Sequence, residues 1–255
     1  MIDNSIKLGE NTRLPLIKAL VGSHNYNLNT SKSDKDYKVF ALPTFDDLYS
    51  NTDYTQSISS DEEDMVVHDV RKLSQLFYKA NVNYLEVLYS KDLQILLPKD
   101  HKSYEDLIEL INKREEICKM NMPYLFHACK GMYYTYKKTM LNKNKDFTES
   151  LGYAPKLAMG AYRIMDFLTR YKQFIRMDVQ DPFALAINYF HEDEKHELLN
   201  IRNGIYSLDQ MNAILEAKYN RTMAACEQYY LDQEEDIELK AWIDNKLKKI
   251  IKDNM

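Results

Sequence analysis

The chain has 255 residues, 45% of them hydrophobic, and a formal net charge of −5 at pH 7. This length is enough for one large domain or two small ones, and the hydrophobic content is ordinary for a globular protein. The negative charge argues against a protein that coats nucleic acid, although it is compatible with local basic patches. Cys118, Cys129 and Cys226 are too few and too widely spaced to predict a disulfide framework or a zinc site.

The chain shows no targeting pattern. The N-terminus lacks a basic-then-apolar signal, and no apolar run approaches the length that spans a bilayer. We therefore expect a cytoplasmic protein without membrane contact. The 6 Gly and 6 Pro, beside 20 Tyr and many Lys and Asn, are typical of an AT-rich coding source such as a Gram-positive bacterium or its phage, which would place the protein in the host cytoplasm.

The first part of the chain reads as a mixture of strands and short helices. Apolar runs predict three strands, at 16–21, 36–42 and 65–70. The polar segment from 46 to 63 predicts a loop. Apolar residues spaced three and four apart predict a helix from about 70 to 80, followed by a short element over 84–89.

From residue 104 onward the periodicity is helical. Tyr104–Met120 repeats apolar residues at three and four, and Pro123 and Pro155 stand where helices would begin. Ser207 with Gln210 predicts a capping box. The remaining predicted segments are a linker at 142–150, a short helix from 181 and a terminal helix at 234–250. The pattern predicts an α+β protein, with a small mixed-sheet core over residues 1–95 and a mostly helical domain over 103–255.

The most informative segment runs from Val21 to Tyr37. Gly22 and Ser23 follow a buried strand, where a turn can present backbone N–H groups and a hydroxyl to phosphate oxygens. Asp34 and Asp36 are two residues apart at the start of the next strand, so both carboxylates point to one face and can meet the same hard cation. Together these features indicate phosphoryl chemistry.

This arrangement resembles the DNA polymerase β-like nucleotidyltransferase superfamily, whose pattern is G-S followed by a strand with S-D-x-D. Asp64–Leu73 and Ala80–Leu88 resemble one branch, the predicted nucleotidyltransferases that include RNA-ligase-associated proteins. Looser matches extend the resemblance to roughly residues 14–230. Asn27 stands where the family usually has glycine, and asparagine tolerates the left-handed backbone that such a turn needs. Gly160 replaces a histidine that is frequent in the RNA-ligase-associated branch.

The resemblance implies transfer of an NMP from a nucleoside triphosphate, such as ATP, to a hydroxyl acceptor. Two Mg²⁺ ions, or Mn²⁺, suit this chemistry, because one lowers the pKa of the attacking hydroxyl and the other screens the leaving pyrophosphate. Asp34, Asp36 and Asp69 are the expected metal ligands. Asp69 reaches the metal if its strand pairs beside 36–42; alternatively, it is a carboxylate favoured by the dipole of the following helix.

Six further residues are candidates for binding phosphate. Gly22 and Ser23 belong to the turn, His24 follows it, and Lys72 belongs to the Arg-Lys pair after Asp69. Lys156 and Arg163 are seven residues apart on one predicted helix. The alternatives are an exposed turn histidine for His24, a solvated helix face for Lys72 and surface salt bridges for the last two.

The acceptor is left open among an RNA end, a protein side chain and a small molecule. A stripe of tyrosines and lysines would suit single-stranded RNA, or it consists of core tyrosines with solvated lysines: Tyr133, Tyr134, Tyr136, Lys130, Lys137, Lys138, Lys143 and Lys145. The alternative to an enzyme is a degenerate nucleotidyltransferase fold that binds nucleotide or a partner without turnover. The intact Gly22, Ser23, Asp34 and Asp36 favour the enzyme.

Overall fold

The computed structural model describes residues 6–8, 11–31, 33–59, 63–143 and 146–255. The chain forms two compact units, one of Met1–Met120 with Asp236–Met255 and one of Asn121–Glu235. This division differs from the predicted domains, because the helices after residue 103 do not all belong together. Those at 104–119 and the last helix of the chain complete the unit that holds the sheet.

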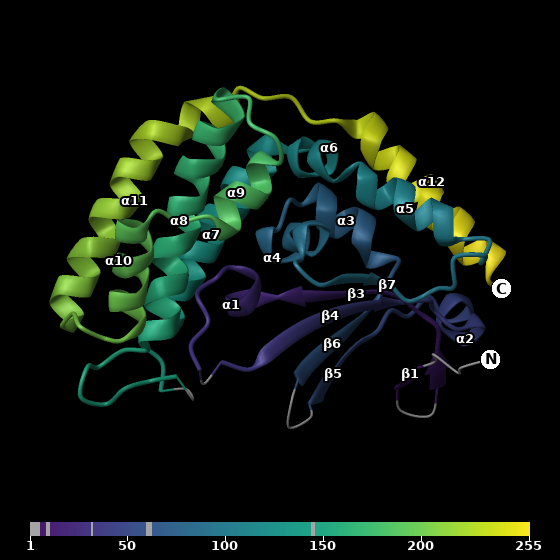
Figure 1. The fold of residues 1–255 in the computed structure, drawn as a ribbon, viewed down its shortest axis with the longest axis horizontal. Helices are drawn as coiled ribbons and strands as arrows, with labels where there is room; N and C mark the ends of the chain where they lie inside the picture. The colour runs from purple at the N-terminus through teal and green to yellow at the C-terminus, as the bar shows by residue number, and fades with distance from the viewer. Residues whose placement is uncertain (1–5, 9–10, 32, 60–62, 144–145) are drawn as a thin grey trace. The chain divides into compact units, whose positions relative to one another are not determined.

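The first unit is built on a mixed five-stranded sheet with the order β5-β6-β4-β3-β7 (Figure 1). Its centre is the antiparallel pair β3 (Pro15–Val21) and β4 (Lys35–Ala41), and β6 (Glu63–Asp69) runs parallel to β4. The edges are β5 (Thr55–Ser59) and β7 (Leu93–Ile95), both antiparallel to their neighbours. The three predicted strands are therefore confirmed, together with the α+β class.

Alternation along β4 and β6 gives the sheet two distinct faces. Val39, Ala41 and Val67 form a buried cluster on one face. Phe40 and His68, which are register partners, stack on the other face with ring centroids 5.5 Å apart. Register partners in a parallel ladder project to the same face of the sheet, and the face alternates along each strand. The register therefore also determines the face of the residues at the start of β4 and β6.

Short helices lie over the Phe40 face of the sheet (Figure 1). They are α3 (Lys72–Tyr78), α4 (Val82–Leu85) and the 3₁₀ helix η1 (Glu86–Tyr89). The predicted helix near 70–80 and the short element at 84–89 are thereby confirmed. Phe77, Val82 and Leu85 are buried, so apolar side chains attach these helices to the sheet.

Three longer helices complete the first unit: α5 (Tyr104–Asn112), α6 (Arg114–Lys119) and α12 (Ile237–Asp253). The helical pattern predicted over 104–120 is interrupted at Lys113, which separates α5 from α6. The last helix packs against α3 and α5. Lys246 of α12 joins it to α5 through an ion pair with Asp106, 2.8 Å long.

The segment predicted as a loop over 46–63 contains regular structure. Helix α2 (Phe45–Tyr49) begins at Thr44, whose hydroxyl accepts from the backbone of Asp47 while the Asp47 carboxylate accepts from Thr44. This capping box is a local signal that the prediction missed. Strand β5 is polar and largely exposed, so it lacks the apolar alternation by which strands are usually identified. A small sheet of β1 (Ile6–Leu8) and β2 (Asn11–Arg13) was also not predicted.

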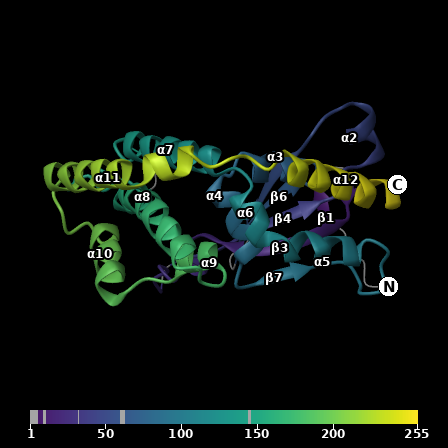
Figure 2. The same ribbon diagram turned by 90° about the horizontal axis from the view of Figure 1, so that it is seen from above.

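The second unit is helical. Three long helices pack side by side (Figure 2): α7 (Met122–Thr139), α8 (Pro155–Arg176) and α11 (Leu208–Leu231). Pro123 and Pro155 lie in the first turns of α7 and α8, as predicted. The predicted capping box of Ser207 and Gln210 is present at the start of α11.

Two shorter helices pack against α8. The first is α9 (Pro182–Asn188), which begins where a short helix was predicted. The second is α10 (Glu192–Arg202), which was not predicted. Among the residues that the structure describes, no helix is both long and apolar enough to cross a bilayer.

The burial of His68 predicts a pH-dependent stability. Burial lowers the pKa of His68 to about 4, and the nearby Lys38 and Lys72 cations act in the same direction. Unfolding restores the ordinary pKa of about 6.5, so the unfolded state binds the proton first as the pH falls. We expect His68 to contribute a loss of about 3 kcal/mol in the free energy of unfolding between pH 6.5 and 4.

The measurement is urea unfolding at several pH values. His68→Phe keeps an aromatic ring beside Phe40 and removes the titrating group, so the difference between wild type and this variant should grow toward low pH. Exposed His127 provides the control, because His127→Gln should leave the pH profile of wild type unchanged. Identical slopes for wild type and His68→Phe would contradict the account.

Candidate active site

The Gly-Ser turn and the Asp-x-Asp strand meet at one end of the sheet. Register places Val21, the last residue of β3, opposite Asp36 on β4. Gly22 opens the short helix α1 (Gly22–Asn25) with a φ of +72°. A Cβ placed on Gly22 would lie 3.0 Å from Oδ2 of Asp36. The left-handed backbone favours glycine at this position, and a side chain there would also have to displace the Asp36 carboxylate.

A segment after η1 fastens this turn from the side. Ser90 Oγ donates to the carbonyl of Leu20 at 2.8 Å, and the N–H of Leu20 donates to the carbonyl of Asp92 at 3.1 Å. The backbone N–H of Lys91 donates to Oδ1 of the buried Asn25 at 3.1 Å. These bonds hold both ends of the turn against residues 90–92, so the turn is preformed.

Glu86 supports the turn from inside the protein. Its side chain is almost fully buried, and Oε2 accepts a hydrogen bond of 3.3 Å from the N–H of Gly22. Its other oxygen lies 3.8 Å from Nζ of Lys38, which is on the same face of β4 as Asp36. The Gly22 N–H is therefore engaged, and the backbone donors for a phosphate are those that follow it.

His24 and Asn27 shape the rest of the loop. Nε2 of His24 lies 2.9 Å from the carbonyl of Ser33, which ties the turn to the residue before the Asp34-x-Asp36 pair. Asn27 has a φ of +61°, as expected for an asparagine in place of glycine. The Lys91 ammonium donates to the His24 carbonyl at 3.3 Å and to Oδ1 of Asn27. The sequence analysis did not identify this exposed cation, because no motif around Lys91 indicates that it lies beside the turn.

The carboxylate beside Asp36 comes from Asp64. The parallel register of β4 and β6 pairs Asp36 with Asp64, and the stacking of Phe40 on His68 confirms that such partners share a face. Asp36 is exposed and Asp64 half-buried. Asp34 is exposed directly before β4, so three carboxylates gather at this end of the sheet.

The structure corrects the predicted place of Asp69. This residue pairs with Ala41, which lies five residues beyond Asp36 and therefore about 16 Å along the strand. It also belongs to the Val39 and Ala41 face of the sheet, opposite to Asp36. The prediction assumed that pairing of the two strands would bring Asp69 to Asp36. In a parallel pair, however, the first residues of the strands lie side by side, so Asp36 near the start of β4 meets Asp64 near the start of β6.

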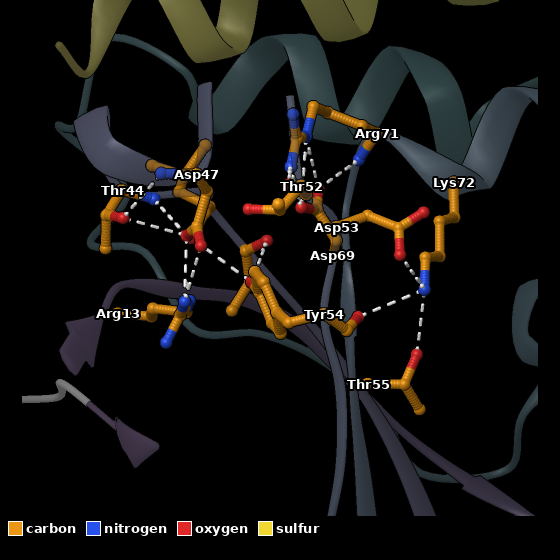
Figure 3. A network of polar contacts seen from close by, with 12 residues as sticks. Arg13, Thr44, Asp47, Thr52, Asp53, Tyr54, Thr55, Asp69, Arg71 and Lys72 are labelled. Carbon is orange, nitrogen blue, oxygen red and sulfur yellow. Dashed lines mark hydrogen bonds and ion pairs between the residues drawn. The ribbon is translucent and has the colours of Figure 1, made fainter. Parts of the chain in front are cut away.

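Asp69 has a structural environment at the other end of the strands (Figure 3). It is fully buried, and its carboxylate accepts from the backbone N–H, Nε and Nη2 of Arg71 at 2.9, 3.0 and 2.6 Å. These bonds raise the pKa of Arg71 above its usual value. Arg71 also donates to the carbonyl of Thr52. Asp69 thus anchors the start of α3, in agreement with the alternative interpretation.

Lys72 belongs to the same network. Its ammonium lies 2.9 Å from Oδ1 of Asp53 and donates to Oγ1 of Thr55 and the carbonyl of Tyr54 at 2.9 and 3.2 Å (Figure 3). Lys72 is therefore held at the Asp69 end of β6 and away from Gly22. The prediction that Lys72 binds phosphate stays a prediction, although its ion pair with Asp53 separates it from the Gly22 turn.

The carboxylates suit a hard cation, although they do not form a complete cage. Within the described part of the chain, no group of three or more His, Cys, Asp or Glu side chains is placed to hold a metal ion. Mg²⁺ commonly takes one or two carboxylates and completes its shell with water and substrate phosphates. Asp34, Asp36 and Asp64 supply oxygen donors of this kind next to a glycine that leaves room for them.

The remaining predicted phosphate ligands lie in the second unit. Lys156 is exposed at the start of α8, whereas Arg163 is only 4% exposed. The two residues therefore do not share an exposed face, although they are seven residues apart. Their role in binding phosphate stays a prediction.

The tyrosines of α7 are mainly packing residues. Tyr133 is buried and stacks on Tyr219 at 4.8 Å, and its hydroxyl donates to the carbonyl of Leu215. The ring of Tyr136 packs against Gly160. Tyr134 is about half exposed, and Lys145 lies outside the described residues. Of the two interpretations of this stripe, the structure favours the second, in which the tyrosines belong to the core and the lysines are solvated.

Comparison with known proteins identifies the family. No curated protein matches the chain. A family model described as RlaP, the RNA repair pathway DNA polymerase beta family, matches residues 9–245. This range includes the Gly22 turn, the three carboxylates, all of the second unit and most of the first, and it confirms the resemblance noted in the sequence. The chain therefore belongs to the RlaP family, an RNA repair branch of the polymerase β-like nucleotidyltransferases.

Proposed function

We propose that this protein is a divalent-metal-dependent nucleotidyltransferase that transfers an NMP from a nucleoside triphosphate to a hydroxyl group at an RNA end. The observation that carries the proposal is the contact of Gly22 with Asp36, with Asp64 as the register partner of Asp36. The family supports a nucleotidyltransferase in an RNA repair context.

Each residue of the site has a role in this reaction. The hydroxyl oxygen of the acceptor attacks the α-phosphorus, the bond from this phosphorus to the bridging oxygen breaks, and pyrophosphate leaves. Asp34, Asp36 and Asp64 would hold Mg²⁺ or Mn²⁺, and the ion would lower the pKa of the attacking hydroxyl, whose proton passes to solvent, and would screen the developing charge. Ser23 and the backbone N–H groups after Gly22 bind the phosphates.

Two groups near the turn have supporting roles. The Lys91 ammonium adds positive charge beside the phosphate site and fastens the turn through the His24 carbonyl and Asn27. Glu86 fixes the N–H of Gly22. Because the turn is held before the substrate arrives, little ordering of the backbone is needed on binding.

Label transfer tests the proposal. Wild type and Asp36→Asn are incubated with each of the four α-labelled ribonucleotides, Mg²⁺ or Mn²⁺, and RNA or total protein as acceptors. We expect label to enter RNA with wild type alone, and the effective nucleotide gives the base preference. Label that enters protein instead would replace the RNA acceptor. Metal-dependent nucleotide binding without any transfer would support a degenerate fold that binds nucleotide.

The three aspartates can be ranked by substitution. We expect Asp36→Asn and Asp64→Asn to lower turnover about 100-fold or more, because loss of a metal ligand removes several kcal/mol of charge stabilisation. Asp69→Asn should keep most of the turnover and lose about 2 kcal/mol or more of stability, since it leaves Arg71 without its buried partner. Initial rates and urea unfolding measure the two effects. Full activity of Asp64→Asn with an inactive, folded Asp69→Asn would reverse the assignment.

Gly22 should be sensitive to a single methyl group. Gly22→Ala places Cβ 3.0 Å from the Asp36 carboxylate at a left-handed φ, so we expect about 1–2 kcal/mol of lost stability and a marked loss of turnover. The control is Gly131→Ala, where a Cβ has no neighbour within 4 Å, and this variant should retain the wild-type rate. An active Gly22→Ala protein would show that the close approach is not needed.

A further inference from the structure

Two hollows of the first unit meet at Arg71, at the end of β6 that lies away from the candidate active site. One has a volume of about 660 Å³ and lies along the outer side of α3, where Thr52, Lys72 and Lys79 line it. The other, of about 530 Å³, lies on α12. Arg71 lines both, and the two hollows together are called the Arg71 surface below.

This surface is basic, although the protein as a whole is acidic. Five cationic side chains and two carboxylates, Asp53 and Asp244, line the two hollows, which gives a net charge of +3 on a chain whose net charge is −5. Arg71 and Lys72 are held in place by Asp69 and Asp53.

Three of the cations are available for a ligand. Lys79, Lys248 and Lys252 are exposed, and they form no ion pair within 4.0 Å with any residue that the structure describes. Lys248 and Lys252 line the hollow on α12 together with the apolar side chains of Leu247 and Ile251, whereas Lys79 lines the hollow along α3.

Two exposed aromatic rings lie on α2, the helix that contributes Leu48 to the same surface. Leu48 of α2 lines the hollow on α12 together with Met255, which places α2 beside the end of the last helix (Figure 2). On α2, Phe45 and Tyr49 are 71% and 84% exposed. Their rings stack on each other, with centroids 6.2 Å apart. A contiguous pair of exposed apolar rings is a feature by which interaction sites are recognised.

We propose that the Arg71 surface, with Phe45 and Tyr49, binds a single-stranded segment of RNA. A groove of cations for the phosphates beside aromatic rings for the bases is the combination by which proteins hold single strands without reading their sequence. This site is additional to the nucleotide site, and its identification with the acceptor strand rests on the proposed function. The two sites are separated along β6 by the five residues from Asp64 to Asp69, about 16 Å, which one strand can span.

Fluorescence anisotropy with a labelled oligouridylate of about 16 nucleotides tests the site, since single-strand surfaces cover up to about this length. The assay contains neither metal ion nor nucleoside triphosphate, so it does not depend on catalysis. We expect Lys79→Gln/Lys248→Gln/Lys252→Gln to weaken binding about tenfold or more and to reduce the slope of log affinity against log salt by about 2. Phe45→Ala/Tyr49→Ala should weaken binding about tenfold, with the salt slope unchanged.

Matched control variants distinguish RNA binding at this surface from the effects of net charge and of non-specific contacts with exposed aromatic rings. Lys7→Gln/Lys99→Gln/Lys102→Gln removes three exposed lysines of the same unit that line neither hollow, and Tyr124→Ala/Tyr189→Ala removes two exposed rings elsewhere. Both should bind RNA as wild type does.

Three results would overturn the proposal: equal losses in the lysine variant and its control, an unaffected Phe45→Ala/Tyr49→Ala protein, or full displacement of RNA by polyglutamate, which would indicate an acidic protein partner. Label transfer by wild type decides the proposed function independently, so failure of one proposal does not conceal failure of the other.

Discussion

The site depends on the pairing of β4 with strands on both sides. On one side, the antiparallel pairing with β3 brings Gly22 to Asp36, so closely that a Cβ on Gly22 would meet the carboxylate at 3.0 Å. On the other side, the parallel pairing with β6 brings Asp64 to the same place. A shift of one residue in the parallel ladder would turn Asp36 and Asp64 to opposite faces. The buried rings of Phe40 and His68, stacked across β4 and β6, oppose such a shift.

The same parallel register divides the polar residues of the first unit into two groups at opposite ends of the strands. Asp34, Asp36 and Asp64 remain accessible and are left for a cation and its substrate. Asp69 and Asp47 are buried and held by Arg71 and Arg13, the latter through two bonds of 2.8 and 2.9 Å (Figure 3). Carboxylates that are buried require such partners. The first group is therefore accessible to a ligand, and the second attaches α2 to β2 and the start of α3 to the end of β6.

Local patterns predicted what depends on local sequence. The Gly22-Ser23 turn, the Asp34-x-Asp36 pair, three central strands and most long helices could be predicted, as could the tolerance of Asn27 for a positive φ. The sequence analysis selected Asp69 and not Asp64, because neither strand sequence indicates whether β4 and β6 pair in parallel or antiparallel. Strand β5 is polar and shows no alternation of apolar and polar residues. No residue pattern in or near α12 indicates that this helix belongs to the first unit. Lys91 reaches the turn through contacts more than 60 residues apart in sequence, which no periodicity reports.

The most direct test of the central claim is a crystal structure with Mn²⁺ and a non-hydrolysable nucleoside triphosphate, with the metal located by anomalous scattering. The account predicts Mn²⁺ between Asp36 and Asp64, with the triphosphate on the turn that begins at Gly22 and Ser23. Mn²⁺ bound at Asp69, or a triphosphate bound away from the Gly22 turn, would contradict it.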